Sequence, residues 1–264
     1  MKHFVIVIIA VLLLPLLAKS VQAELRAAGS DSTATVVRSL FEAFQAKTGV
    51  PVKMTGGGSS VGAKAALNGE VDIAFLSRNL HESEKEAGLV EMPYAIDGVA
   101  VITNKTNPID DISIENLRNL FSGKLKMWSN GKPFLLYNRD ANSGTRECFE
   151  KKVMQGRPFS KRVRVATNLN IIGDAKRDPT AVGYTSASSV GKSIKVLRID
   201  GIAPTPENLI SGKYPICRTL VFATMGPPTG EAKAFLDFVK SPQGEATIKS
   251  AGYIPLCDSK RPEK

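Results

Sequence analysis

Histidine is nearly absent from this sequence, which has only His3 and His81 among its 264 residues. A serine hydrolase needs a histidine base beside its nucleophile, and no Gly-x-Ser-x-Gly elbow is followed by a suitable histidine. Cysteine is scarce as well, and without a Cys-x-x-Cys pair no zinc site is expected. The sequence therefore predicts a protein that is not an enzyme and that holds no metal or cofactor. A hydrolase is kept as the enzymatic alternative.

Long basic runs are also missing, although the formal net charge is +10. Lys and Arg occur in short groups such as Lys151-Lys152 and Lys161-Arg162. Because no basic run is interleaved with aromatic residues, no nucleic-acid partner is predicted. A dispersed positive field would instead help to attract a small anion.

The longest apolar run stands at the start of the chain. Lys2 precedes the run, which covers Phe4–Ala18 and is interrupted only by Pro15. The run is short for a membrane span of about 20 residues, and Ala23 supplies a small residue at a cleavage position. We therefore expect residues 1–23 to be a signal peptide rather than an anchor. No cysteine lies near this site, which argues against lipid attachment, and the mature chain is expected in the periplasm.

Three cysteines remain in the exported part of the chain, namely Cys148, Cys217 and Cys257. An oxidising compartment permits one disulfide and leaves one thiol. Cys217 and Cys257 each follow a Pro-Ile or Pro-Leu dipeptide, and they are the predicted pair. Cys148 falls in a predicted helix, where it is expected to be buried.

A strand, a tight polar loop and a helix meet in the middle of the chain. The apolar run at 134–137 predicts a buried strand, and 147–154 predicts a helix. Ser143 is a good N-cap, and Gly144 lets the backbone approach a ligand closely. Free amides at the helix start attract anions, and Arg139 has a planar fork that grips them. The alternative is an ordinary capped helix with a surface Arg–Asp pair.

The same pattern occurs near the start of the mature chain. Consecutive glycines in the loop at 55–62 allow a backbone nest whose amides would face an anion. A third strand delivers Ser77 and Arg78 at its end, and ligands of open α/β sheets bind at such carboxyl ends. The expected elements are strands at 25–28, 50–54 and 71–76, a helix opened by 29–33 and ended by Gly49, and a helix that runs to Leu67.

Several motifs together resemble the periplasmic phosphate-binding protein family of phosphate ABC transporters, over nearly the whole mature chain. The motifs are Gly29-Ser30-Asp31-Ser32-Thr33, Gly58-Ser59-Ser60, Val71-Asp72-Ile73, Arg139 with Ser143-Gly144-Thr145, residues 114–123 with Trp128, Ala181-Val182-Gly183-Tyr184, and Ser241-Pro242-Gln243-Gly244 with 251–256. The element of Arg139 with Ser143-Gly144-Thr145 is the most specific of them.

The resemblance implies a two-lobed α/β fold of the type II periplasmic binding proteins, closing on its ligand around a hinge. Lobe 1 would comprise residues 24–103 and 220–264, and lobe 2 would comprise residues 104–219. The implied partners are inorganic phosphate and the membrane permease subunits of an ABC transporter, and the protein is expected to be a monomer.

The resemblance also implies a ligand set drawn from both lobes. It consists of Ser32, Thr33, Ser59, Ser77, Arg139, Ser143, Gly144 and Thr145. The best-known members carry an aspartate where this chain has Ser77, and that aspartate accepts the proton of hydrogen phosphate and repels sulfate. Asp31 and Asp140 are the nearby carboxylates that could replace it. Sulfate, molybdate or another oxyanion remains an alternative ligand, and a sensing subunit without a transporter remains an alternative role.

Overall fold

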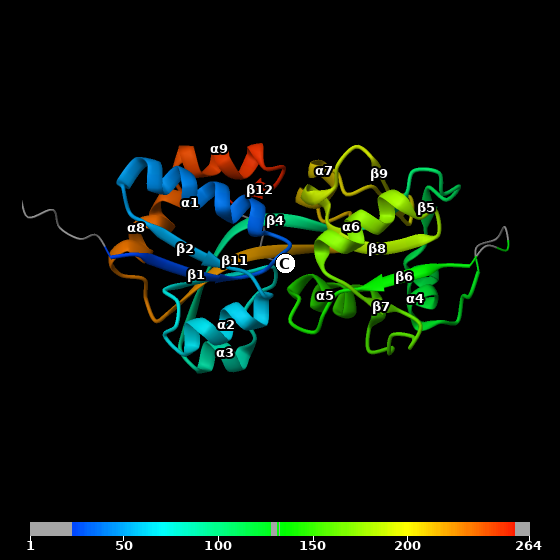
Figure 1. The fold of residues 1–264 in the computed structure, drawn as a ribbon, viewed down its shortest axis with the longest axis horizontal. Helices are drawn as coiled ribbons and strands as arrows, with labels where there is room; N and C mark the ends of the chain where they lie inside the picture. The colour runs from blue at the N-terminus through cyan, green and yellow to red at the C-terminus, as the bar shows by residue number, and fades with distance from the viewer. Residues whose placement is uncertain (1–22, 128–130, 132, 257–264) are drawn as a thin grey trace, which may run out of the picture.

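The computed structural model describes residues 23–127, 131 and 133–256. Figure 1 shows two lobes side by side, joined by the long strands β4 (Leu89–Asn104) and β11 (Cys217–Met225). Lobe 1 is defined here by β1–β3, α1–α3, α8 and α9, and lobe 2 by β5–β10 and α4–α7. The mixed α/β architecture and the two lobes agree with the predicted fold class.

The helices follow in chain order. They are α1 (Ala34–Thr48), α2 (Ser59–Leu67), α3 (Glu82–Glu86), α4 (Ile114–Ser122), α5 (Gly144–Phe149), α6 (Asn168–Arg177), α7 (Pro206–Ile210), α8 (Gly230–Val239) and α9 (Pro242–Ser250). The remaining strands are β1 (Leu25–Gly29), β2 (Val52–Thr55), β3 (Ile73–Leu76), β5 (Asp111–Ile112), β6 (Leu135–Asn138), β7 (Arg164–Val165), β8 (Ala181–Ser186), β9 (Ile194–Val196), β10 (Arg198–Ile199) and β12 (Ile254–Pro255).

One sheet runs through both lobes in the order β2-β1-β3-β11-β4-β8-β6-β7, and β9 and β12 also pair with β4. Within lobe 1, β1 is parallel to β2 and β3. Within lobe 2, β6 is parallel to β7 and β8. The connecting strands β4 and β11 are antiparallel to each other and to their outer neighbours. The predicted lobe boundaries lie within these two strands, at 103/104 in β4 and at 219/220 in β11. The boundaries stay a prediction.

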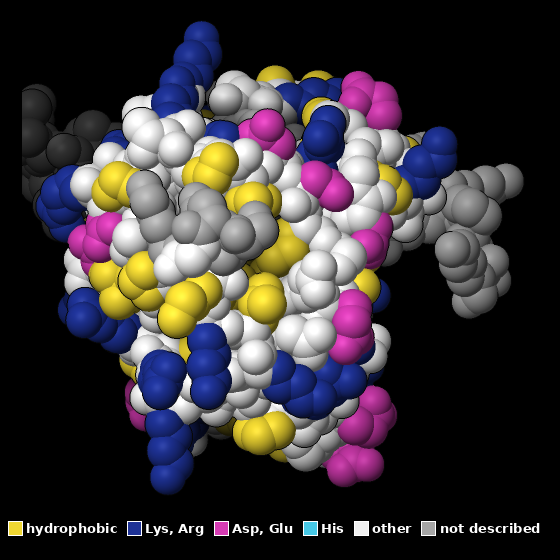
Figure 2. All heavy atoms as spheres, turned by 90° about the vertical axis from the view of Figure 1, so that its right-hand side faces the viewer, with side chains coloured by type: hydrophobic (Ala, Val, Ile, Leu, Met, Phe, Trp, Pro, Cys, Tyr) yellow, Lys and Arg dark blue, Asp and Glu magenta, His cyan; other side chains and the backbone are white. Residues whose placement is uncertain are grey.

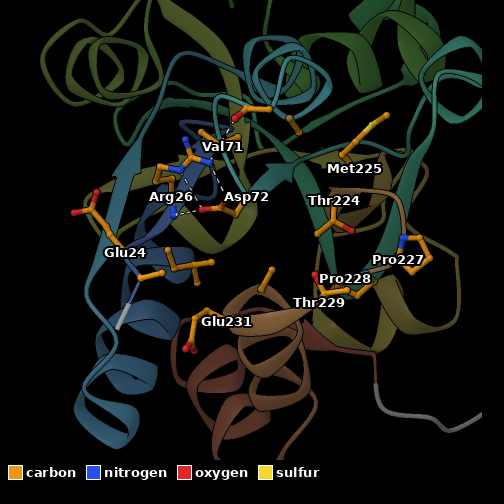
Figure 3. Close-up of a pocket in the computed structure, with 15 residues that line it drawn as sticks. Glu24, Arg26, Val71, Asp72, Thr224, Met225, Pro227, Pro228, Thr229 and Glu231 are labelled. Carbon is orange, nitrogen blue, oxygen red and sulfur yellow. Dashed lines mark hydrogen bonds and ion pairs between the residues drawn. The ribbon is translucent and has the colours of Figure 1, made fainter. Parts of the chain in front are cut away.

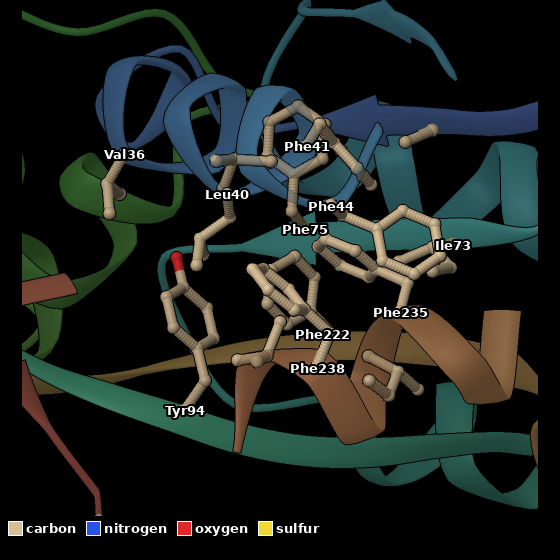
Figure 4. Packing of buried hydrophobic residues seen from close by; sticks show 14 of the residues in the cluster. Val36, Leu40, Phe41, Phe44, Ile73, Phe75, Tyr94, Phe222, Phe235 and Phe238 are labelled. Carbon is tan, nitrogen blue, oxygen red and sulfur yellow. The ribbon is translucent and has the colours of Figure 1, made fainter. Parts of the chain in front are cut away.

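The core of lobe 1 forms where α1 places its apolar stripe on the sheet. Phe41 and Phe44 follow each other at helical spacing, and both are buried against Phe235 of α8. Figure 4 shows these rings beside Phe75 and Phe222 from the sheet. Gly49 ends α1 in the left-handed conformation, as predicted. Burial of this aromatic cluster fixes the helix on the sheet and therefore fixes the loop that precedes it.

Lobe 2 has its own aromatic core. The rings of Phe149 and Tyr184 stack with centroids 4.0 Å apart, and Phe121 packs edge-on against both. The predicted helix at 147–154 is present, but its second half, Glu150–Met154, is π-helical. The stacked Phe149 anchors α5 to the sheet, so the loop before α5 is held in place as well.

The surface carries its charge in a dispersed form. On the face that Figure 2 shows, Lys and Arg side chains are spread among neutral and acidic residues.

Within the part of the chain that the structure describes, no helix is long and apolar enough to cross a membrane. The predicted signal peptide lies outside the described residues, apart from Ala23.

The predicted disulfide is not supported. Cys148 and Cys217 carry free thiols, and the Cys148 Sγ atom lies 3.9 Å from the Cys217 carbonyl oxygen. Cys257, the other member of the predicted pair, lies outside the described residues. Cys148 is half-buried rather than buried, and burial raises the pKa of its thiol to about 11.

Candidate functional site

The candidate site lies where the carboxyl ends of strands from both lobes meet. The parallel strands β1 and β3 end at Gly29 and Leu76, so Ser30 and Ser77 follow at the same edge of the sheet. In lobe 2, β6 ends at Asn138 and delivers Arg139. This is the placement expected for ligand sites in open α/β sheets.

Hydroxyl groups from three segments of lobe 1 and one of lobe 2 form a buried cluster. Ser77 Oγ lies 2.9 Å from Ser30 Oγ and 3.3 Å from Ser59 Oγ. Thr145 of lobe 2 donates to Ser32 Oγ over 2.9 Å. These five side chains are all buried, so their hydroxyls are shielded from bulk water. Hydrogen bonds from them to a ligand would be stronger in this low-dielectric environment than in water.

Arg139 is the buried cation of the predicted set. Its side chain is 1% exposed, and its Nε atom has no hydrogen-bond partner among the described residues. The contacts of its fork are long, with Nη1 3.4 Å from Asn168 Oδ1 and Nη2 3.5 Å from Asp140 and 3.8 Å from Asp31. Burial lowers the pKa of the guanidinium, and the two carboxylates act in the opposite direction. A buried guanidinium with an unused N–H donor is suited to bind an anion, which would compensate its charge and accept the hydrogen bond.

The loop before α5 follows the predicted pattern. Ser143 caps the helix, because its hydroxyl accepts from the Arg146 amide over 3.3 Å. Gly144 lies directly against lobe 1: a Cβ atom at this position would be 2.5 Å from Ser59 Oγ and 2.8 Å from Ser77 Oγ. Glycine is therefore required at this position for the two lobes to meet as they do.

Two predicted features differ from the structure. The expected glycine nest is absent, because the Gly57 amide donates to Asp31 and the Gly58 amide donates to the Gly29 carbonyl. Both glycines have positive φ, which lets this loop fold onto the β1 loop instead of presenting its amides to a ligand. Thr33 is buried, but its hydroxyl donates to the Ser30 carbonyl within its own loop.

A second buried cation beside the hydroxyl cluster was missed by the sequence analysis. Arg218, at the start of β11, pairs with the buried Asp97 of β4 over 2.6 Å. Its Nη1 atom donates to Thr145 Oγ1 over 2.6 Å, and its Nη2 atom lies 3.4 Å from Ser32 Oγ. The sequence did contain an indication of this site, namely a charged residue within an apolar strand. Such a residue is buried only when it is paired.

Charged and polar side chains also make contact between the lobes beside the cluster. Glu147 of α5 lies 2.9 Å from Arg78 Nε and 2.9 Å from His81 Nε2, which both belong to lobe 1. Arg78 is held in turn by both oxygens of Glu84. His81 is half-exposed just before α3, where it contacts the other lobe through Glu147.

A cavity of about 500 Å³ lies elsewhere, at the amino ends of the lobe 1 strands. Figure 3 shows Arg26 and Asp72 paired on one side of it and Pro227 and Pro228 on the other. Because β1 and β3 begin here and end at the hydroxyl cluster, this cavity is separated from the candidate site by the length of the strands.

Comparison with known proteins places these observations in a family. Residues 18–243 match the family model described as a PBP superfamily domain. The chain is 31% identical to the phosphate-binding protein PstS of Bacillus subtilis, over 88% of this chain and 80% of that protein.

Solved structures agree with this relationship. A putative phosphate ABC transporter substrate-binding protein from Clostridium perfringens, with bound phosphate, superposes with a TM-score of 0.85 at 30% identity, covering 89% of this chain and 100% of that one. An ABC-type phosphate transport receptor from Vibrio cholerae gives a TM-score of 0.74 at 28% identity, covering 87% and 99%. The chain therefore belongs to the PBP superfamily and, within it, to the family of the PstS phosphate-binding proteins.

Proposed function

We propose that this protein captures inorganic phosphate between its two lobes and delivers it to the permease subunits of an ABC transporter. The observation that carries this function is Arg139, a buried cation whose Nε has no hydrogen-bond partner in the described part of the chain, beside a cluster of buried hydroxyls. A tetrahedral oxyanion matches this donor set, because hydroxyls and amides donate to its oxygens and the guanidinium compensates its charge.

The roles of the ligand set follow from their positions. Arg139 binds the charge of the anion, while Ser32, Ser59 and Ser77 donate from lobe 1. The α5 start of lobe 2 contributes the Gly144 and Thr145 amides, which have no partner within the helix, and the Ser143 hydroxyl, whereas the Ser143 amide donates to the Asp140 carbonyl over 3.2 Å. Thr33 is the weakest member of the set, because its hydroxyl and its amide both donate to the Ser30 carbonyl within its own loop, over 3.4 and 3.3 Å.

Residues 1–23 are removed on export, and the mature monomer works in the periplasm. The lobes open and close around β4 and β11, which is the usual response of hinged binding proteins. The relatives are named as binding proteins and transport receptors rather than enzymes, and a hydrolase is not proposed.

Titration calorimetry on the mature protein, purified in phosphate-free buffer, tests the proposal. Phosphate is expected to bind one site per chain with a Kd of about 1 μM or below, which corresponds to about −8 kcal/mol. Ester and phosphomonoester substrates incubated with the same protein should remain intact. The absence of phosphate binding would contradict the proposed function.

A further inference from the structure

His81 lies at the junction of the two lobes, in the wall of a cavity of about 540 Å³. Lobe 1 contributes Arg78 and His81 to this wall, and lobe 2 contributes Glu147 of α5. His81 Nε2 lies 2.9 Å from Glu147 Oε1, so the ring contacts the helix whose first residues belong to the proposed phosphate site. The only other histidine of the chain, His3, lies in the predicted signal peptide.

The backbone of His81 is held to lobe 1. Its amide donates to Glu84 Oε2 over 2.8 Å, and its carbonyl accepts from the Glu84 amide over 3.0 Å. The Glu84 carboxylate is held in turn by both Nη atoms of the buried Arg78, over 2.7 Å each. The ring therefore faces lobe 2 from a fixed point, and it stays with lobe 1 when the lobes separate.

The His81 ring lies between two carboxylates. Its Nε2 atom is 2.9 Å from Glu147 Oε1 of lobe 2, and its Nδ1 atom is 3.7 Å from Glu84 Oε1 of lobe 1. A carboxylate only accepts hydrogen bonds, and a neutral imidazole has one N–H group, whereas a protonated imidazole has two. The neutral ring can direct a proton toward one of the carboxylates, while the protonated ring directs one toward each and adds a positive charge between them.

Opening of the lobes would remove only one of these carboxylates. Glu84 belongs to α3 and stays beside His81, whereas Glu147 leaves with α5. The other carboxylate oxygen of Glu147 lies 2.9 Å from Arg78 Nε. Because arginine stays charged at any pH that the protein meets, the contact with Arg78 attracts the lobes at every pH. The contact with His81 adds attraction only when the ring is protonated, since histidine changes its charge between about pH 5 and 8.

The remaining charged and titratable groups around His81 do not reverse this attraction. They are Lys151, Lys152, Arg218, Cys148 and Cys217 in the cavity wall, Glu82 and Lys85 of α3, and Glu91 of β4, which accepts from the Leu80 amide. The groups on α3, β4 and β11 stay near the ring when α5 leaves, so they act similarly in both states. Lys151 and Lys152 move with lobe 2, but both are exposed to water, which weakens their repulsion, whereas Glu147 contacts the ring directly.

We propose that His81 is a positioning residue for phosphate capture, because its protonated ring holds Glu147 across the junction and favours the closed lobes. This inference rests on the proposed function, since His81 acts on phosphate through closure and not through contact with the anion. Protonation favours the closed state, so the contribution of His81 to phosphate affinity is present at acidic pH. It is lost as the pH rises through the range in which histidine titrates.

Calorimetric titration with sodium phosphate at about pH 5.5 and about pH 8 tests the inference on the mature wild-type protein and on His81→Gln. Phosphate itself titrates over this range, but its titration cancels in the ratio of the two Kd values at one pH. Glutamine keeps a neutral N–H donor, so the ratio of variant Kd to wild-type Kd should be within about twofold at the higher pH. At the lower pH the ratio should be about two- to fivefold larger, as expected for a half-exposed ion pair.

Two further variants show where the proton acts. Glu147→Gln removes the partner in lobe 2, so adding His81→Gln to it should change the Kd by the same factor at both pH values. Lys85→Gln removes a charge from α3, where Lys85 pairs with Glu82 over 3.7 Å, and its Kd relative to the wild type should not depend on pH. Thermal melts of each variant verify folding.

The outcomes distinguish this inference from the proposed function. A His81→Gln ratio that is the same at both pH values would overturn the inference and leave the phosphate function standing. A pH dependence of this ratio that persists in the Glu147→Gln background would also overturn it, because the protonated ring would then act through another group. Absence of phosphate binding by the folded wild-type protein at both pH values would overturn the proposed function and this inference with it.

Discussion

Replacing Arg139 by methionine should change stability and affinity in opposite directions. Without ligand, the guanidinium is 1% exposed, and its contacts among the described residues are long ones to Asp31, Asp140 and Asn168. Both carboxylates are about 40% exposed, so each ion pair stabilises by about 0–1 kcal/mol. Desolvation of a buried ion costs several kcal/mol, so Arg139→Met should be neutral or stabilise the free protein by about 1–2 kcal/mol.

Affinity should fall in the same variant. A hydrogen bond to a charged group contributes about 1.5–3 kcal/mol, which corresponds to about a 10- to 150-fold rise in the phosphate Kd. Thermal melting in phosphate-free buffer measures the first effect, and calorimetric titration with phosphate measures the second. The gain in melting temperature at saturating phosphate should shrink accordingly.

Arg146→Met is the matched control for this prediction. Arg146 stands past the turn, where it pairs with Glu150 over 2.8 Å and lies 5.4 Å from the Phe159 ring centroid. Its loss should change the phosphate Kd by no more than about threefold. A destabilised Arg139→Met protein that retains the wild-type phosphate Kd would refute the assignment of Arg139 as the anion-binding cation.

Further predictions address the lobe junction, the ion pairs and the chain start. Gly144→Ala should prevent closure, because its Cβ would meet Ser59 and Ser77 oxygens; small-angle scattering should show no compaction on phosphate addition, and normal compaction would contradict the geometry. Glu147→Gln should weaken phosphate binding several-fold, because it loosens the contacts with Arg78 and His81. A calorimetric phosphate Kd equal to that of the wild type would contradict this prediction. Burial raises the pKa of Glu84, but hydrogen bonds from Arg78 and the His81 amide prevail and lower it. Ionised Glu84 therefore stabilises the folded protein above the unfolded pKa of about 4.3, and this stabilisation is lost as the pH falls through the lower folded pKa. Denaturant titrations measure the free energy of unfolding as a function of pH. In Glu84→Gln this free energy should no longer fall at acid pH through the titration of residue 84. A pH dependence identical to that of the wild type would contradict this role of Glu84. Intact mass of periplasmic protein should place the first residue at Glu24, whereas recovery with Met1 in the membrane fraction would exclude cleavage.

Local pattern alone determined the elements that carry the site. The polar loop at 29–33 and Gly49 marked the two ends of α1, and the Ser143 cap predicted the start of α5. Both features depend on neighbours within a few residues, and they appear in the structure as predicted. The order of strand, polar loop and helix also indicated an anion site, because free amides and small residues recur at each helix start.

Pairings between distant segments were decided by the tertiary structure. Arg218 reaches Ser32 and Thr145 because β11 runs between the two lobes, and no spacing in the sequence indicates that path. The glycine loop has the flexibility of a nest, but its amides are used by Asp31 and by the Gly29 carbonyl of the neighbouring loop. A backbone amide bonds whichever acceptor the fold brings near it, so composition permits a site while packing assigns its donors.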